Sequence, residues 1–133
     1  MSAKWIIAVG ALLAAAGVGL GAFGAHGLED FLRRQGYEAD LEKRMAWFET
    51  GVRYQLYHAI GLLAVAALGG AQATGGYRGT AWLLILGVAL FSGSLYAMTF
   101  INKAGRILVI MTPLGGLLLI VGWIVLATTA LRK

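Results

Sequence analysis

The chain has 133 residues, of which 59% are hydrophobic and 13% are charged, and its mean hydropathy is +0.78. A soluble domain carries about 25% charged residues, and a domain this small cannot hide so much apolar surface from water. The composition therefore favours a membrane protein. The absence of cysteine excludes a disulfide framework, thiolate catalysis and sulfur-based metal sites. The net charge of +5 comes from few, dispersed bases, which do not indicate nucleic-acid binding.

Four apolar runs are long enough to cross a hydrocarbon core of about 30 Å as helices. They cover residues 5–25, 52–70, 79–101 and 107–131. The second run contains Arg53 and His58, and the other three are uncharged. The sequence therefore predicts an all-α integral membrane protein, a four-helix bundle that forms one domain over residues 1–133.

The first run shares features with a secretory signal, because Lys4 precedes it and small residues are frequent near its end. Its 21 apolar residues exceed the signal core, which usually has about 7–15 residues. We therefore expect a retained membrane helix.

The connection 28–50 differs from the rest of the chain because it holds all six acids. Four acids precede a base by four residues, a spacing that stabilises helices by about 0.2–0.5 kcal/mol per pair. The pairs are Glu29–Arg33, Asp30–Arg34, Asp40–Arg44 and Glu49–Arg53. Apolar residues line one side of each half: Leu28, Phe31 and Leu32, then Leu41, Met45 and Phe48. We predict two amphipathic helices on the membrane surface, and the alternative is a solvated loop.

These two helices are expected to break near Gly36, with Asp40 capping the second, which continues into the second span. The positive-inside rule sets their side of the membrane. The termini and the 71–78 loop hold four Lys and Arg residues, and the opposite side holds seven. This distribution favours both termini outside and the amphipathic connection in the cytoplasm of a multi-pass inner-membrane protein.

Glycine provides 20 of the 133 residues, about twice the usual share of ~7%. In the first run small residues recur every three or four positions, at Gly10, Ala14, Gly17, Gly21 and Gly24. Similar positions in the third and fourth runs are Gly87, Ser94, Gly115, Gly116 and Gly122. Because lipid provides little hydrophobic drive between helices, small residues favour close packing. These positions are therefore predicted helix contacts, and general glycine enrichment is the alternative.

Pro113 is expected to kink the last span, because proline removes a backbone donor and clashes one turn back. The carbonyl freed near Val109 then needs a partner. Hydroxyl groups of the third span are candidates: Ser92, Ser94, Tyr96 and Thr99.

One polar cluster is predicted near the amphipathic connection, formed by His26, Glu49, Arg53, Tyr54, Tyr57 and His58. Tyr54 and His58 share one helical stripe, and Glu49, Arg53 and Tyr57 share the next. His26 can approach this helix if the first two spans are neighbours. Ionisable groups at membrane depth usually face the bundle interior or water, so the cluster is the candidate functional site.

Four interpretations of the cluster stay open. In a lipid-headgroup site, Arg53 would hold an anion and the tyrosines would form the rim. A metal site would use His26, Glu49 and His58, although no recognised ligand spacing supports it. A proton relay would use His58 with Glu49. In the fourth, the groups form a hydrogen-bond network that fixes the surface helices on the bundle.

We expect a non-enzymatic protein that binds a lipid headgroup or a partner protein, because no catalytic constellation is visible. No cofactor or metal is predicted, and the expected partners are membrane lipids, a second copy of the chain or another membrane protein. The alternative is a small proton- or solute-transporting protein or channel subunit.

Five stretches also resemble a known family. They are 21–28 (GAFGAHGL), 50–59 (TGVRYQLYHA), 90–96 (LFSGSLY), 112–116 (TPLGG) and 122–123 (GW). In this order they resemble the small membrane family called domain of unknown function 423, with its YgdD-like and YwdK-like bacterial proteins and, more distantly, animal transmembrane protein 256. The resemblance implies four spans and the inner membrane. It places the family's recurring polar positions on His26, Arg53, Tyr54, Gln55, Tyr57, His58, Ser92 and Ser94.

Overall fold

The computed structural model describes residues 2–71, 75–102 and 105–132. The elements in chain order are α1 (Ala3–His26), α2 (Leu28–Arg34), the 3₁₀ turn η1 (Glu38–Asp40), α3 (Leu41–Gly69), α4 (Gly76–Phe100) and α5 (Arg106–Leu131). The predicted all-α class is therefore confirmed. Three helices, α1, α4 and α5, are long and apolar enough to cross a membrane. The predicted second run lies in the later part of α3, which begins earlier because the amphipathic segment joins it without a break.

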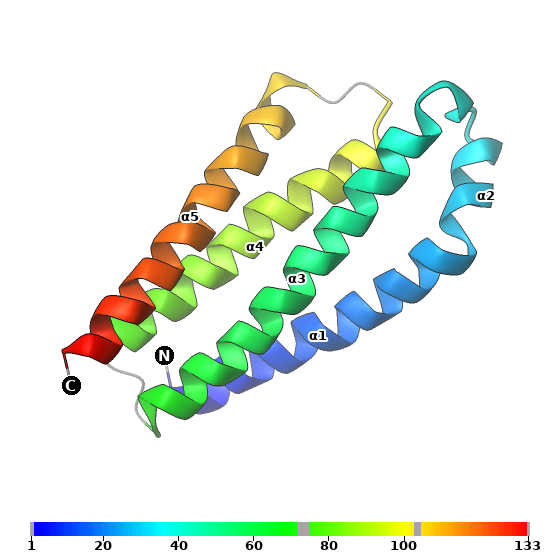
Figure 1. The fold of residues 1–133 in the computed structure, drawn as a ribbon. Coiled ribbons are helices and arrows are strands. Elements are labelled where there is room, and N and C mark those ends of the chain that lie inside the picture. Colours follow the sequence, from blue (N-terminus) through cyan, green and yellow to red (C-terminus); the bar gives the residue numbers. More distant parts are fainter. Residues whose placement is uncertain (1, 72–74, 103–104, 133) are drawn as a thin grey trace.

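The four long helices lie side by side and alternate in direction (Figure 1). Both chain ends lie at one end of the molecule, and α2 lies at the other. The main contacts follow chain order: α1 with α3, α3 with α4, and α4 with α5. The helices therefore pack as successive antiparallel neighbours, with α1 and α5 outermost and α3 between two apolar helices.

The amphipathic connection packs against the long helices. Leu28 and Leu32 of α2 are fully buried against Phe48 and Val52 of α3, whereas the predicted apolar position Phe31 is exposed. The expected break lies at Gly36, whose φ of +81° favours glycine. The apolar side of α2 therefore covers protein, which fixes the position of the connection.

Three of the four predicted acid–base pairs form, namely those of Arg33, Arg44 and Arg53. Asp30 and Arg34 form no ion pair among the described residues. Asp40 does stand at the N-cap position of α3, but its carboxylate makes no capping hydrogen bond. It accepts a hydrogen bond from Arg44 instead.

The small residues of α1 face α3. A Cβ added at Gly17 would lie 2.7 Å from Cδ2 of Leu56, and one added at Gly24 would lie 3.0 Å from Cε1 of Phe48. In contrast, nothing lies within 4 Å of a Cβ added at Gly19. The spacing of small residues along α1 therefore follows the face that contacts α3.

The approach of α4 to α5 is closer still. A Cβ added at Gly87 would lie 2.5 Å from Cδ2 of Leu119, and one added at Gly115 would lie 2.4 Å from the backbone nitrogen of Phe91. The same Cβ at Gly115 would lie 2.9 Å from the carbonyl oxygen of Gly87. Backbone therefore meets backbone where these two glycines cross.

Hydroxyl groups lie beside Pro113, and α5 continues through this proline to Leu131. The hydroxyl oxygens of Ser94 and Thr112 are 2.7 Å apart, so one donates to the other. Thr112 also lies within hydrogen-bond distance of the carbonyl of Leu108, at 3.2 Å. Ser94 thus reaches the proline turn as expected, but its partner is a side chain rather than the carbonyl of Val109.

Candidate functional site

The structure separates the two histidines of the predicted cluster. Gly24 lies against Phe48 and Gly10 lies against Ala59, which fixes the register of α1 on α3. His26 at the end of α1 is therefore level with the start of α3, roughly three helical turns away from His58. No group of three His, Asp or Glu side chains in the described ranges could hold a metal ion.

The two predicted stripes of α3 face different surroundings. Glu49, Arg53 and Tyr57 are exposed, and Arg53 forms an ion pair with Glu49. The ring of Tyr54 packs on Phe91 of α4 at 4.4 Å. Tyr54 is also partly exposed, and its ring lies 6.3 Å from that of Tyr57 in the other stripe.

His58 is buried where α3 meets α5. Its ring lies 5.9 Å from that of Trp123. Its Nδ1 is 2.6 Å from the carbonyl oxygen of Tyr54. Because a carbonyl only accepts hydrogen bonds, Nδ1 carries the proton and donates it. These contacts hold the imidazole within the helix packing, and a role in proton transfer stays a prediction.

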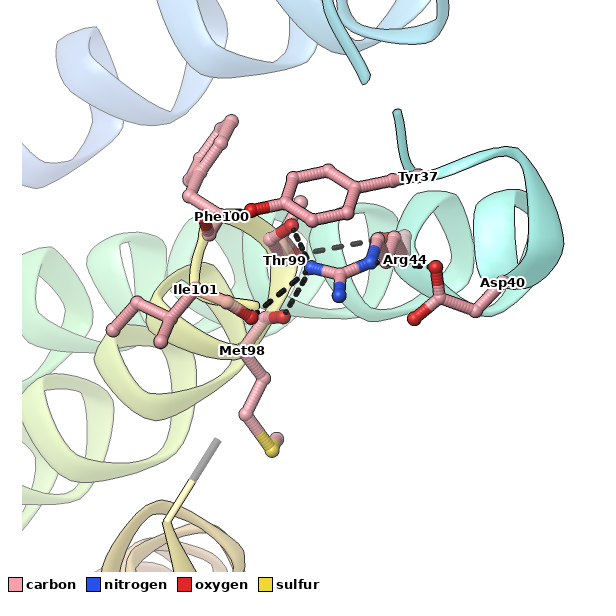
Figure 2. A network of polar contacts seen from close by, with 7 residues as sticks. All are labelled: Tyr37, Asp40, Arg44, Met98, Thr99, Phe100 and Ile101. Carbon is pink, nitrogen blue, oxygen red and sulfur yellow. Dashed lines mark hydrogen bonds and ion pairs between the residues drawn. The ribbon is translucent and has the colours of Figure 1, made fainter. Parts of the chain in front are cut away.

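Arg44, which the sequence pattern predicts only as half of a charge pair, lies at the centre of a polar network (Figure 2). Its side chain is buried, and its Nη1 donates to the carbonyl oxygens of Met98, Thr99 and Ile101 at 3.2, 2.7 and 3.2 Å. The last carbonyls of a helix have no partner within the helix, and a cation there is favoured by the helix dipole. Arg44 therefore caps the C-terminus of α4 and ties it to the start of α3.

Tyr37 and Asp40 complete this arginine cap. The guanidinium of Arg44 lies 3.7 Å from the centre of the Tyr37 ring, and the Tyr37 hydroxyl donates to the carbonyl of Phe100. Asp40 accepts from Nε of Arg44 at 2.9 Å, and this hydrogen bond lowers the pKa of the Asp40 carboxyl. The cap thus fixes the amphipathic connection on the bundle.

A second set of polar contacts, centred on Gln55, joins α1, α3 and α4. The amide nitrogen of Gln55 donates to the carbonyl of Leu13 in α1, and its oxygen accepts from the hydroxyl of Tyr96 in α4, both at 2.8 Å. Ser92 of α4 also donates to the carbonyl of Gly51 in α3. Such bonds hold helices together where lipid gives little drive for association.

An apolar cavity of about 310 Å³ lies between α1 and α3, close to α2. Small and apolar residues line it together with one carboxylate: Gly21, Gly24, Ala25, Leu28, Met45, Phe48, Glu49 and Val52. Its volume is at the lower end of the range of ligand pockets, about 300–1,000 Å³. Of the six predicted cluster residues, only Glu49 lines it.

A polar groove of about 870 Å³ adjoins this cavity. It runs between α2 and the start of α3, with η1 at one end, and shares Met45 and Glu49 with the apolar cavity. Glu49 thus stands where an apolar space meets a charged one, with Arg53 as its partner. This pair of spaces is the candidate site, and it could hold a molecule with one apolar and one polar end.

Comparisons with known proteins identify the family. Residues 20–116 match the sequence model of a family described as protein of unknown function DUF423. The chain belongs to this family. It is 42% identical over 132 residues to the UPF0382 membrane protein YwdK of Bacillus subtilis, covering 97% of this chain and 98% of that one. It is 42% identical over 129 residues to a UPF0382 membrane protein of Staphylococcus epidermidis, covering 97% of each.

A more distant relative is the UPF0382 inner membrane protein YgdD of Escherichia coli, 30% identical over 132 residues, with 99% of this chain and 93% of that one covered. No solved structure matches the chain. This DUF423 protein is therefore a multi-pass protein of the cell or inner membrane. The matched segment contains every residue that lines the cavity and the groove.

Proposed function

We propose that this DUF423 protein is a non-enzymatic membrane protein that binds a lipid at the junction of α1, α2 and α3. One acyl chain occupies the apolar cavity, and the headgroup lies at Glu49 and Arg53. The observation that carries the proposal is the apolar cavity, because a single charged residue stands at its edge. Arg53 pairs with Glu49 through Nη2, and its other donors are suited to a phosphate.

The proposal includes four membrane crossings, by α1, the later part of α3, α4 and α5. The position of α3 supports a crossing by this helix, because α3 lies antiparallel between α1 and α4, which are each apolar enough to span a membrane. α2 and the first turns of α3 lie at the interface, where Trp47 and the charged residues of the groove suit the headgroup region. Both termini lie outside, and α2 lies in the cytoplasm.

Single-cysteine labelling tests this topology, since the natural chain has no cysteine. Ser2→Cys marks the end with the termini, and Gln35→Cys marks the end with α2. A membrane-impermeant maleimide applied to intact spheroplasts should label the first variant and not the second. Labelling of Gln35→Cys alone would show the opposite orientation, and labelling of both or neither would contradict a crossing by α1, the helix between the two sites.

Filling the cavity should abolish lipid retention. A Cβ added at Gly21 meets only Cγ1 of Val52, at 3.5 Å, so a side chain can enter the space without striking the backbone. We expect Gly21→Leu to lose the lipid that wild type retains in native mass spectrometry after mild extraction. Gly19→Leu, the same change at an open position of α1, should retain it.

Ala25→Leu provides a second blocking variant, because Ala25 lines the cavity and is partly open to the surroundings. Thermal unfolding of each variant in detergent distinguishes a blocked site from an unfolded bundle. Equal lipid retention by wild type and both folded blocking variants would overturn the proposal. Wild-type protein that carries no defined lipid would also overturn it. A stoichiometric protein partner found in place of the lipid would indicate that the site binds a protein instead.

A further inference from the structure

The polar groove carries an excess of negative charge in a chain whose net charge is +5. Its lining contains five of the six acidic side chains of the chain and only two basic ones, Arg33 and Lys43. Arg33 is engaged by Glu29, and the ammonium of Lys43 lies over the ring of Trp47 at 5.0 Å. The groove is therefore acidic although the protein as a whole is basic.

Two carboxylates of the groove are left to act on a ligand. Asp40 is paired with Arg44, and Glu49 is paired with Arg53. Glu38 lies on η1 and Glu42 lies in the first turn of α3, and neither forms an ion pair among the described residues. The acids line the groove without converging on one point, because no three of them in the described ranges could share a metal ion.

These features select the chemistry of the occupant. An acidic groove favours a cation, and spread carboxylates suit an extended ligand better than a metal ion. The groove also meets the apolar cavity at Met45 and Glu49, so one molecule with a cationic headgroup and an apolar chain can occupy both. A basic peptide would fill the groove but leaves the cavity unexplained.

We propose that the site selects a zwitterionic aminophospholipid, of the phosphatidylethanolamine class, over anionic phospholipids. The primary ammonium lies at the unpaired carboxylates of Glu38 and Glu42, the phosphate meets Arg53, and one acyl chain enters the cavity beside Gly21. The proposal rests on the lipid-binding function above and adds the class of headgroup. An anionic headgroup would place its negative charge against the same carboxylates, which is unfavourable.

Competition between lipids tests the selectivity. Purified wild type is exchanged into mixed micelles with equal amounts of phosphatidylethanolamine and phosphatidylglycerol, and native mass spectrometry measures the ratio of the two bound forms. We expect phosphatidylethanolamine to exceed phosphatidylglycerol by roughly tenfold, as one charge-assisted hydrogen bond would provide. The double variant Glu38→Gln, Glu42→Gln should bring this ratio close to one.

The matched control is Asp30→Asn, which removes an exposed acid of the same connection that does not line the groove. It should keep the wild-type ratio. Equal binding of the two lipids by wild type, or a preference for phosphatidylglycerol, would overturn the headgroup assignment while leaving lipid binding intact. An unchanged ratio in the double variant would also overturn it. Absence of both lipids from wild type would overturn the lipid-binding function itself.

Discussion

Gly115→Ala is expected to lower the free energy of unfolding by about 3 kcal/mol, the upper end of the usual cost of overpacking. The new methyl group would lie 2.4 Å from the backbone nitrogen of Phe91 and 2.9 Å from its Cα. A flexible side chain can turn away from such a contact, but backbone cannot. The two helices must therefore move apart, which loosens the neighbouring crossing of Gly87 with Leu119.

Gly116→Ala is the matched control for this variant. Its methyl group would lie 3.6 Å from the Phe91 ring, an ordinary contact, and alanine has the higher helix propensity. Its stability should equal or slightly exceed that of wild type. Thermal unfolding of both variants in one detergent measures the difference. Equal stability of the two alanine variants would mean that α4 and α5 do not approach each other at Gly115.

Arg44→Leu is expected to cost about 3 kcal/mol, because hydrogen bonds to a charged donor contribute more than neutral ones. The loss leaves three carbonyls at the end of α4 without their buried donor, namely those of Met98, Thr99 and Ile101. Leucine keeps only the apolar part of the arginine side chain nearest the backbone and lacks the guanidinium that makes these hydrogen bonds. Proteolysis should also cut the 28–40 connection more readily, since the cap holds it on the bundle.

Arg33→Leu is the control, because Arg33 also follows its acid by four residues but forms an exposed pair. Exposed pairs contribute about 0–1 kcal/mol, so this variant should unfold close to wild type. Urea unfolding of the two variants, with far-ultraviolet circular dichroism as the readout, gives the comparison. A similar small effect at both positions would contradict the capping role of Arg44.

Arg33 and Arg44 show which features can be predicted from the sequence and which cannot. Both stand four residues after an acid, and this local pattern predicts both ion pairs. The burial of Arg44 depends on carbonyl groups 54 to 57 residues later, which no local pattern contains. The helical class, the three apolar helices and the break at Gly36 could be predicted because each depends on neighbouring residues alone.

The candidate site could be predicted only in part for the same reason. Helical spacing predicts one stripe with Tyr54 and His58 and a neighbouring one with Glu49 and Arg53, but in the structure His58 is buried and Tyr54 is exposed. The distance from His26 to His58 depends on the register of α1 on α3, which the contact of Gly24 with Phe48 fixes. The cavity itself is the space left where small residues of α1 meet α3. The small residues can be found in the sequence, but the cavity depends on how the two helices pack and cannot.

The most direct test of the lipid site is photo-crosslinking of wild-type protein in its membrane with a phospholipid that carries a diazirine on one acyl chain. Trypsin can release residues 45–53 as one peptide, which contains Met45, Phe48, Glu49 and Val52 of the cavity. The lipid adduct should concentrate on this peptide and on residues 5–33. Adducts spread over residues 107–132, the outer helix α5, without enrichment at 45–53 would contradict the account.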